Sequence, residues 1–409
     1  MLFQKKYLDV YVNIETGMSG DDSVTDTDTD ALKVLNTEIM AGTGPDVLLL
    51  DGISEDTYIE KGMLEDLSGV LKDTDILSNI KDAYTKEDGS IYTMPVKFGI
   101  PMIEGNKDII AGITDLTTEA DAAESQKDSY GKLQFFSDFS IAPSYLIQGT
   151  IDNSIPAWMN EDGTLNENAV KEYLEQVNRI WQTQKNAIEE TKKAYQMGDD
   201  WADSDHSGYM DISGSVTSLL AKVDTVAAGG LLSPEGLVSL DSARKVDPDL
   251  DYKLLNGQSE NCFYPRSAVG VSAKASEKEA AEKFVKFLFE EESQRASNTE
   301  GLAVNSKVYE DMAYWKMGKS SGDTIGSIGA SYDTGDGNIK QIEMDEIIPE
   351  DEAIQNIMDL GKTLTVPAKS NQIIRNAVTE SGEKYLNGET GLDDAVKEIM
   401  QEVNLYLSE

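Results

Sequence analysis

The chain has 409 residues, which is enough for two sizeable domains at roughly 100–200 residues each. Its 35 Lys and Arg against 75 Asp and Glu give a formal net charge of −40, which repels nucleic acid and anionic lipid head groups. A single cysteine, Cys262, excludes a disulfide framework, and a single histidine, His206, disfavours histidine-rich metal sites. We therefore expect no cofactor, no metal and no nucleic-acid partner.

The start of the chain is predicted to alternate helix and strand. Residues 1–6 are typical of the last turn of a helix and carry no signal-peptide core or cleavage site. Residues 10–14 have strand propensity, with partial alternation of apolar and polar positions. Farther on, Leu32, Leu35 and Ile39 recur at helical spacing, which indicates a second helix.

An apolar run over residues 47–50 is typical of a parallel strand that is covered on both faces. Asp51 and Gly52 follow at the carboxyl end of this strand, where ligands bind in open α/β sheets. A carboxylate beside a glycine indicates a hydrogen-bonding site that backbone approaches closely. The alternative is an ordinary turn with a capping Asp.

Two proline-marked segments are predicted to be extended. Pro95 and Pro101 bracket the first, so residues 95–101 cannot form a regular helix. Pro265 marks the second, over residues 263–270. Two such crossings predict two lobes that more than one strand connects.

Two further patterns concern packing and flexibility. Tyr173, Val177 and Trp181 share one helical stripe, which places Trp181 in a core rather than in a site. Residues 318–338 contain six glycines and little apolar content, which favours a mobile loop or linker.

Several stretches carry a family pattern in a shared order and spacing: residues 35–50, 62–67, 272–288, 301–305 and 403–409. Together they resemble the extracellular solute-binding proteins of ABC importers, in the maltose-binding-like, carbohydrate-binding cluster. The resemblance implies an α/β, two-lobe periplasmic-binding-protein-like fold with a hinge of crossing strands. It also implies a carbohydrate ligand, often an oligosaccharide, held between the lobes, and ABC permease subunits in the membrane as partners.

The same resemblance sets the expected lobes and location. Residues 1–101 and 263–305 would form the N-terminal lobe, and residues 102–262 and 306–409 the C-terminal lobe. Family members begin with a strand and a helix before the segment that residues 3–7 match, so both are expected to be missing here. The family also implies export, with a lipid anchor through an upstream segment, and we expect a monomer at the cell surface.

Carried onto this sequence, the resemblance places Asp51 and Gly52 in the ligand cleft. Phe98 in the first crossing, and Tyr264 and Arg266 in the second, are expected to face the same cleft. For these three residues the alternative is packing within the hinge.

Three more residues are candidates for the site. Gly230 ends a predicted strand where a side chain would block a ligand, and a plain turn is the alternative. Sugars have apolar faces that stack on aromatic rings, so Trp158 and Trp201 are candidate stacking residues. Trp201 lies in a polar loop, where burial does not readily explain a tryptophan. For Trp158 the alternative is core packing.

No nucleophile elbow, phosphate loop or zinc motif occurs in the sequence, so we expect a transport protein rather than an enzyme. A glycoside-processing enzyme needs paired carboxylates about 5–10 Å apart. With 75 acidic residues some pair meets that spacing by chance, so the pattern carries no weight. A cell-surface glycan-binding adhesin of the same fold, without transport, stays open as another class.

Overall fold

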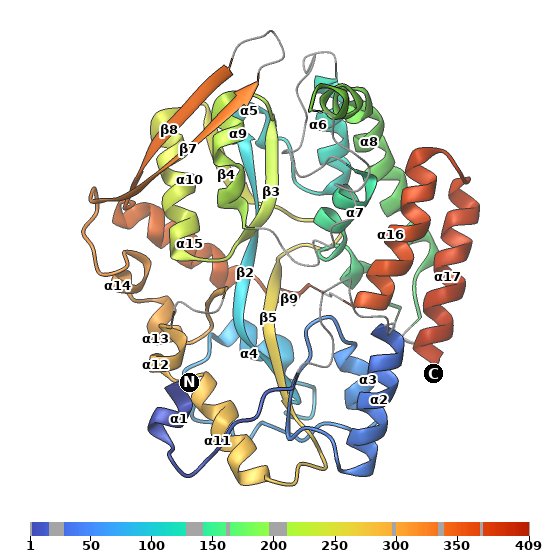
Figure 1. The fold of residues 1–409 in the computed structure, drawn as a ribbon, viewed down its shortest axis with the longest axis vertical. Helices are drawn as coiled ribbons and strands as arrows, with labels where there is room; N and C mark the ends of the chain where they lie inside the picture. The colour runs from blue at the N-terminus through green and yellow to red at the C-terminus, as the bar shows by residue number, and fades with distance from the viewer. Residues whose placement is uncertain are drawn as a thin grey trace. The chain divides into compact units, whose positions relative to one another are not determined.

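The structure is a computed structural model that describes residues 2–15, 28–127, 142–160, 164–195, 211–296, 300–333, 339–368 and 371–408. Two compact units share the chain (Figure 1): unit 1 is Met1–Phe98 with Pro265–Glu310, and unit 2 is Gly99–Tyr264 with Asp311–Glu409. Both units contain helices and strands, so the α/β class expected from the sequence is confirmed. The predicted lobes stay a prediction, because compactness does not show which parts of the chain move together.

Unit 1 consists of short elements around its part of two long strands. In chain order its own elements are α1 (Leu2–Lys6), α2 (Asp28–Ala41), β1 (Val47–Leu49), α3 (Glu55–Glu60), α4 (Ser78–Tyr84), α11 (Lys278–Leu288), α12 (Glu291–Gln294), β6 (Leu302–Ala303) and α13 (Ser306–Tyr309). The long strands, β2 (Thr93–Asn106) and β5 (Cys262–Val271), both run on into unit 2. The two extended crossings predicted from the prolines are therefore confirmed.

Aromatic packing holds the first helix in unit 1. The ring of Phe3 in α1 lies 5.0 Å from that of Phe284 and 5.4 Å from that of Phe287, centroid to centroid, in edge-to-face geometry. Lys6 adds an ion pair with Glu290. The helix predicted at the start of the chain is thus confirmed as α1, and α11 supplies the apolar face on which it packs.

The apolar run after α2 forms β1, but the predicted partner direction is wrong. β1 pairs antiparallel with β5, with Leu48 opposite Gly270. Leu48 is 5% exposed whereas Leu49 is 61% exposed, so one face of the strand is open. The predicted strand over residues 10–14 is also wrong: no strand forms there, and Tyr11 is 82% exposed. Both errors arise because strand propensity determines neither whether a segment pairs with another strand nor in which direction.

Unit 2 contains the larger set of elements. In chain order they are α5 (Lys107–Ile110), α6 (Leu116–Gln126), α7 (Pro143–Ile151), η1 (Ile155–Trp158), α8 (Glu167–Tyr195), η3 (Ile212–Ser215), α9 (Val216–Ala221), β3 (Val226–Leu231), α10 (Pro234–Val246), β4 (Leu250–Leu254), α14 (Met312–Trp315), β7 (Thr324–Asp333), β8 (Ile339–Ile347), α15 (Asp351–Thr363), β9 (Val366–Pro367), α16 (Gln372–Asn387) and α17 (Leu392–Ser408). In the view of Figure 1, α8, α16 and α17 lie on one side of the strands of this unit, and α9 and α10 lie on the other.

The central strand of the unit 2 sheet is β2, which lies between β3 and β4. Ile103 is opposite Ala228 of β3 and Lys253 of β4, and both pairings are antiparallel. At the first residues of β5, Cys262 pairs in parallel with Val366 of β9. No helix in the described part of the chain is long and apolar enough to cross a membrane.

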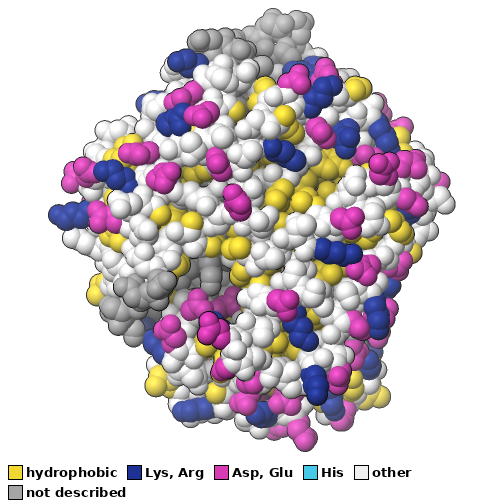
Figure 2. Space-filling model, turned by 180° about the vertical axis from the view of Figure 1, so that it is seen from behind, with side chains coloured by type: hydrophobic (Ala, Val, Ile, Leu, Met, Phe, Trp, Pro, Cys, Tyr) yellow, Lys and Arg dark blue, Asp and Glu magenta, His cyan; other side chains and the backbone are white. Residues whose placement is uncertain are grey.

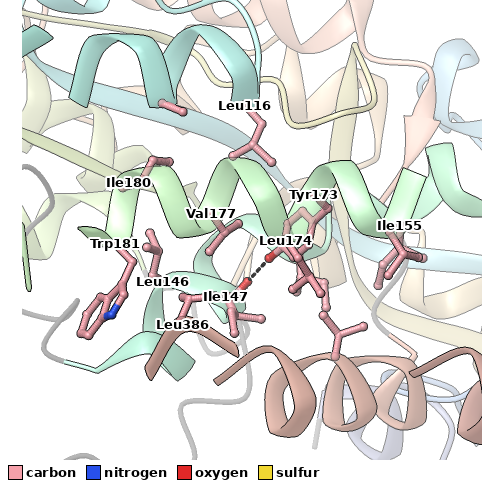
Figure 3. Close-up of a cluster of buried hydrophobic side chains, with 14 of the residues drawn as sticks. Leu116, Leu146, Ile147, Ile155, Tyr173, Leu174, Val177, Ile180, Trp181 and Leu386 are labelled. Carbon is pink, nitrogen blue, oxygen red and sulfur yellow. Dashed lines mark hydrogen bonds between the residues drawn. The ribbon is translucent and has the colours of Figure 1, made fainter. Parts of the chain in front are cut away.

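The main core of unit 2 forms around α7 and α8, and α6, α16 and α17 also contribute to it (Figure 3). From α8 come Tyr173, Val177 and Trp181, and from α7 come Leu146 and Ile147. The hydroxyl of Tyr173 donates to the carbonyl of Ile147 at 2.8 Å, so its polar atom is satisfied inside the core. Trp181 is 4% exposed, which confirms its predicted place in the core.

The glycine-rich stretch 318–338 is not the loop that was predicted. Most of its described part is β7, which pairs with β8 in a two-stranded hairpin. Glycine permits this close pairing: a Cβ on Gly326 would lie 2.9 Å from Oε2 of Glu346, and one on Gly329 would lie 3.1 Å from the carbonyl of Ile342. Residues 334–338 of the predicted loop lie outside the described residues.

The acidic surface is not gathered into one patch on the face that Figure 2 shows. Asp and Glu side chains are spread over that face, with Lys and Arg among them. Exposed ion pairs fit this mixture: Lys171 lies 2.5 Å from Asp393, and Arg179 lies 2.7 Å from Glu124. Pairs of this kind stabilise the fold little, because solvent screens them.

Candidate ligand-binding site

In unit 1, the ladder between β1 and β5 ends at Asp51. Leu50 still donates its N–H to the carbonyl of Ala268, with an N···O distance of 2.8 Å. One residue farther on, the side-chain Oδ1 of Asp51 accepts from the N–H of Ala268 at 3.4 Å. Gly52 follows with φ +78°, a left-handed conformation that glycine adopts without steric cost. The structure therefore places Asp51 and Gly52 in the turn after β1.

Asp51 is exposed as a residue, but protein atoms pack around its carboxyl group. The packing of protein atoms around it raises the pKa of Asp51 above its ordinary value, although the residue as a whole is exposed. The N–H groups of Ala268 and Ser267, and the charge of Arg266, act in the opposite direction because they stabilise the carboxylate. Such a group is open to a ligand while it is only partly hydrated.

Arg266 is a cation whose charge stabilises this carboxylate. Its Nη2 lies 2.6 Å from Oε2 of Glu300, and its side chain is 23% exposed. The chain passes close by at Gly301, which has φ +120°. A Cβ there would lie 3.4 Å from Cγ of Arg266 and 2.6 Å from Cβ of Lys97, so only glycine fits. The structure thus brings Asp51, Gly52 and Arg266 together.

More carboxylates lie near Asp51. Burial raises the pKa of the Tyr84 hydroxyl well above its ordinary value. The charges of Glu55, Asp51 and Asp56 add to this rise. The carboxylate of Glu55 also accepts from the hydroxyl of Thr93. In the part of the chain that the structure describes, no group of three His, Cys, Asp or Glu residues is arranged to hold a metal. The carboxylates around Asp51 therefore disfavour an anionic ligand and favour one that donates hydrogen bonds.

In unit 2 the structure brings Gly230 and Tyr264 together. A Cβ on Gly230 would lie 2.9 Å from Cδ2 of Leu232 and 3.2 Å from Cδ2 of Tyr264. Tyr264 is 3% exposed, and burial raises the pKa of its hydroxyl well above the ordinary value. The missing side chain at Gly230 therefore gives room to two packed neighbours.

Two of the predicted site residues are packing residues instead. Trp158 is fully buried: its Nε1 donates to Oε1 of Gln258 at 2.5 Å, and its ring lies 5.0 Å from that of Tyr173. Phe98 is also fully buried, with its ring 5.5 Å from that of Tyr309 in the same unit. Phe98 lies in a buried strand and Trp158 in a core among helices. Burying an aromatic ring at such a place stabilises the fold. Neither ring offers a free face to a sugar.

The last predicted site residue, Trp201, lies outside the described residues. Ser267 was not singled out, yet it has φ +56° and its N–H faces Asp51. A serine carries no sequence signal for a left-handed conformation, in contrast to glycine or asparagine. Its role emerges only from the β1–β5 pairing.

The chain forms two discontinuous units that share two long strands, and exposed polar groups lie where one strand ends. This arrangement is typical of two-domain ligand-binding proteins. The chain belongs to the bacterial extracellular solute-binding protein family, whose model matches residues 2–295. The family resemblance predicted from the sequence is therefore confirmed. No curated protein sequence matches the chain significantly.

Solved structures share the fold at low sequence identity. An ABC substrate-binding protein from Listeria monocytogenes in complex with cycloalternan is 19% identical, with a TM-score of 0.53, over 100% of this chain and 94% of that one. Maltose-bound MalE3 from T. maritima is 16% identical, with a TM-score of 0.53, over 99% and 94%. A transporter-associated binding protein from B. animalis subsp. lactis in complex with β-1,6-galactobiose is 15% identical, with a TM-score of 0.54, over 99% and 93%.

Proposed function

We propose that the protein is the substrate-binding component of an ABC importer, which captures a carbohydrate and delivers it to a membrane permease. The family supports the transport role, and the ligands of the similar structures support a sugar. We further propose that it acts as a monomer outside the cell, held at the surface by a lipid anchor, and that it lacks hydrolytic activity.

The observation that carries the proposal is the exposed residue Asp51 in the turn after β1, whose carboxylate is stabilised by the charge of the partly buried Arg266 in β5. A sugar hydroxyl both donates and accepts hydrogen bonds, so it can donate to a carboxylate and accept from a guanidinium. Hydrogen bonds to charged partners are shorter and stronger than neutral ones. Gly52 leaves the turn without a side chain beside this pair.

The first experiment identifies the ligand. A thermal-shift screen over oligosaccharides, amino acids and polyamines detects any compound that binds only the folded state, because such binding raises the melting temperature. We expect oligosaccharides to be the class that shifts it. A shift only with amino acids or polyamines would contradict the carbohydrate proposal.

The second experiment tests the site with the best-bound sugar. Asp51→Ala removes a charge-assisted hydrogen bond, whose loss costs about 1.5–3 kcal/mol, or about ten- to a hundredfold in affinity. Titration calorimetry measures the effect, and Asp73→Ala, at another exposed aspartate of unit 1, is the matched control. Trp201→Ala tests the proposed stacking residue through the ligand-induced change in tryptophan fluorescence. Parent-like binding by both site variants would show that the site is placed wrongly.

The absence of hydrolysis is tested separately. Incubation with the best-bound glycan should release no new reducing ends. Turnover that disappears on replacing one carboxylate would make the protein an enzyme.

A further inference from the structure

Ser267 has an unusual backbone conformation for its place in the fold. Among the described residues, the non-glycine positions with positive φ are Lys222, Asn261, Ser267 and Met317. Lys222 is the left-handed residue that ends α9, and Asn261 and Met317 lie outside strands and helices. Ser267, with φ +56°, stands inside β5. Residues held in this way inside regular structure are concentrated at functional sites.

The left-handed residue changes where the backbone N–H groups point. In a regular strand, successive N–H groups point to opposite sides, so two neighbours cannot both bond to one group. A left-handed residue turns successive N–H groups toward one point and makes a small anion-binding concavity. Here the N–H of Ala268 donates to Oδ1 of Asp51 at 3.4 Å, and the N–H of Ser267 lowers the pKa of the same carboxyl.

The left-handed residue in β5 therefore restricts the orientation of the Asp51 carboxylate. An ionised carboxylate has about four acceptor positions, and the two N–H groups use only part of them. Asp51 is exposed as a residue, so acceptor positions that these N–H groups do not use can receive a hydrogen bond from a ligand, with the charge of Arg266 acting on the same carboxylate. A fixed orientation reduces the entropy that ligand binding must otherwise remove.

Resting on the proposed function, we propose that Ser267 is a positioning residue of the ligand site: its left-handed backbone, and not its hydroxyl, orients the carboxylate of Asp51 toward sugar hydroxyls. The positioning acts through Asp51, which touches the ligand. This role separates the backbone of Ser267 from its side chain, so substitutions can test the two independently.

Two substitutions at this position have different expected effects. Ser267→Gly removes the hydroxyl but adopts positive φ freely, whereas Ser267→Thr keeps a hydroxyl but is β-branched and disfavours positive φ. We expect the glycine variant to bind within about threefold of the parent and the threonine variant to bind about ten- to a hundredfold more weakly. Ser331→Thr, at an exposed serine inside strand β7 that has no positive φ, is the matched control.

A ligand-free measurement tests the geometry directly. NMR titration of the Asp51 carboxyl should give the parent pKa in Ser267→Gly and a higher pKa in Ser267→Thr, because the N–H groups that stabilise the carboxylate turn away. Equal pKa values in the two variants would overturn the positioning role. This measurement tests the positioning role even if the threonine variant binds no sugar or is less stable, because it needs only the folded protein. Ser267→Asn serves as a second variant that tolerates positive φ.

Binding assays with maltose and β-1,6-galactobiose as probes complete the test. Under the proposal, Ser267→Thr has no further effect once Asp51→Ala is present, because it acts through that carboxylate. Equal weakening in both backgrounds would overturn the inference. If Asp51→Ala weakens binding and Ser267→Thr does not, the inference fails while the proposed function stands. If Asp51→Ala leaves the binding of both sugars unchanged, the proposed ligand site itself fails.

Discussion

The guanidinium of Arg375 on α16 forms an ion pair with the carboxylate of Asp152, which follows α7, and the two side chains are only 6% and 3% exposed. A buried pair of this kind carries a large desolvation cost, which its own attraction and hydrogen bonds offset. It links two of the helices that form the core of unit 2. The pair therefore stabilises the unit only while both partners are present.

The first prediction concerns the loss of one partner. Arg375→Ala leaves the carboxylate of Asp152 buried without its cation, which should lower the free energy of unfolding by about 3–5 kcal/mol. Urea unfolding measures the change. Lys384→Ala, which breaks an exposed pair with Glu398 at 3.9 Å, is the control and should cost less than about 1 kcal/mol. Similar losses in the two variants would contradict the prediction.

The second prediction concerns pH and Glu104 in β2. This residue is fully buried, and neither carboxyl oxygen has a hydrogen-bond partner among the described residues. Burial raises its pKa well above the ordinary value. The folded state then holds a proton that the unfolded state loses above about pH 4.5, so stability falls as pH rises from there toward the folded pKa.

Glu104→Gln removes this titration. We expect the decline in unfolding free energy above about pH 5 to become shallower, by up to about 1.36 kcal/mol per pH unit. Glu389→Gln, at an exposed position, should leave the decline unchanged. An unaltered pH profile in Glu104→Gln would show that the carboxyl is not held neutral.

The third prediction concerns Lys97 in unit 1. Its side chain is a buried base, in contrast to the buried acid Glu104. Its side chain is buried, its Nζ donates to the carbonyl of Gln294 at 2.6 Å, and burial lowers its pKa to about 8. Below that pH the folded state must hold a buried cation. Because the unfolded state keeps the proton up to about pH 10.4, stability should rise between about pH 8 and that value.

Lys97→Met should abolish this rise and stabilise the protein at neutral pH, since the buried charge is gone. Chemical unfolding at several pH values measures both effects. Lys72→Met, at an exposed lysine of the same unit, should reproduce the parent profile. If the free energy of unfolding of Lys97→Met rises with pH as it does in the parent, a group other than Lys97 causes the rise.

The fourth prediction concerns the open edge of β1. Asp46 and Leu50 bond to β5 through their backbone, so the backbone groups of Val47 and Leu49 point away from it. Among the described residues no strand pairs with β1 on that side. Leu49, 61% exposed, adds an apolar side chain, and such edges favour association between molecules.

Leu49→Lys should therefore reduce association on heating while it shifts the melting temperature little. Light scattering during a thermal ramp measures the association. Val246→Lys replaces a residue of similar exposure, 55%, at the end of helix α10, and should have no such effect. Equal reductions in both variants would point to added charge rather than to the strand edge.

Much of the local structure follows from the sequence alone. The spacing of Tyr173, Val177 and Trp181 predicts a buried helical face, because the 3.6-residue period is a property of the helix itself. Prolines in two segments exclude helix there, and both segments are strands. The family pattern also follows from residues in order, without any knowledge of contacts.

The tertiary structure decided the features that depend on distant partners. The direction of β1 depends on β5, more than 200 residues away along the chain, and no local pattern encodes that pairing. The stretch 318–338 looks like a linker by its glycine content, but Gly326 and Gly329 pair with β8. Trp158 looks like a sugar-stacking residue until Tyr173 and Gln258 enclose it.

In the candidate site too, some residues are predictable from the sequence and others only from the tertiary structure. Asp51 and Gly52 are predictable, because a carboxylate and a glycine after an apolar run mark a strand end. Arg266 was expected beside them from the family resemblance, whereas Ser267 and Glu300 join them only through the pairing of β1 with β5 and the return of the chain at Gly301. Side-chain type and local period are properties of the sequence, whereas the N–H groups that face Asp51 depend on a backbone conformation that long-range packing imposes on a serine.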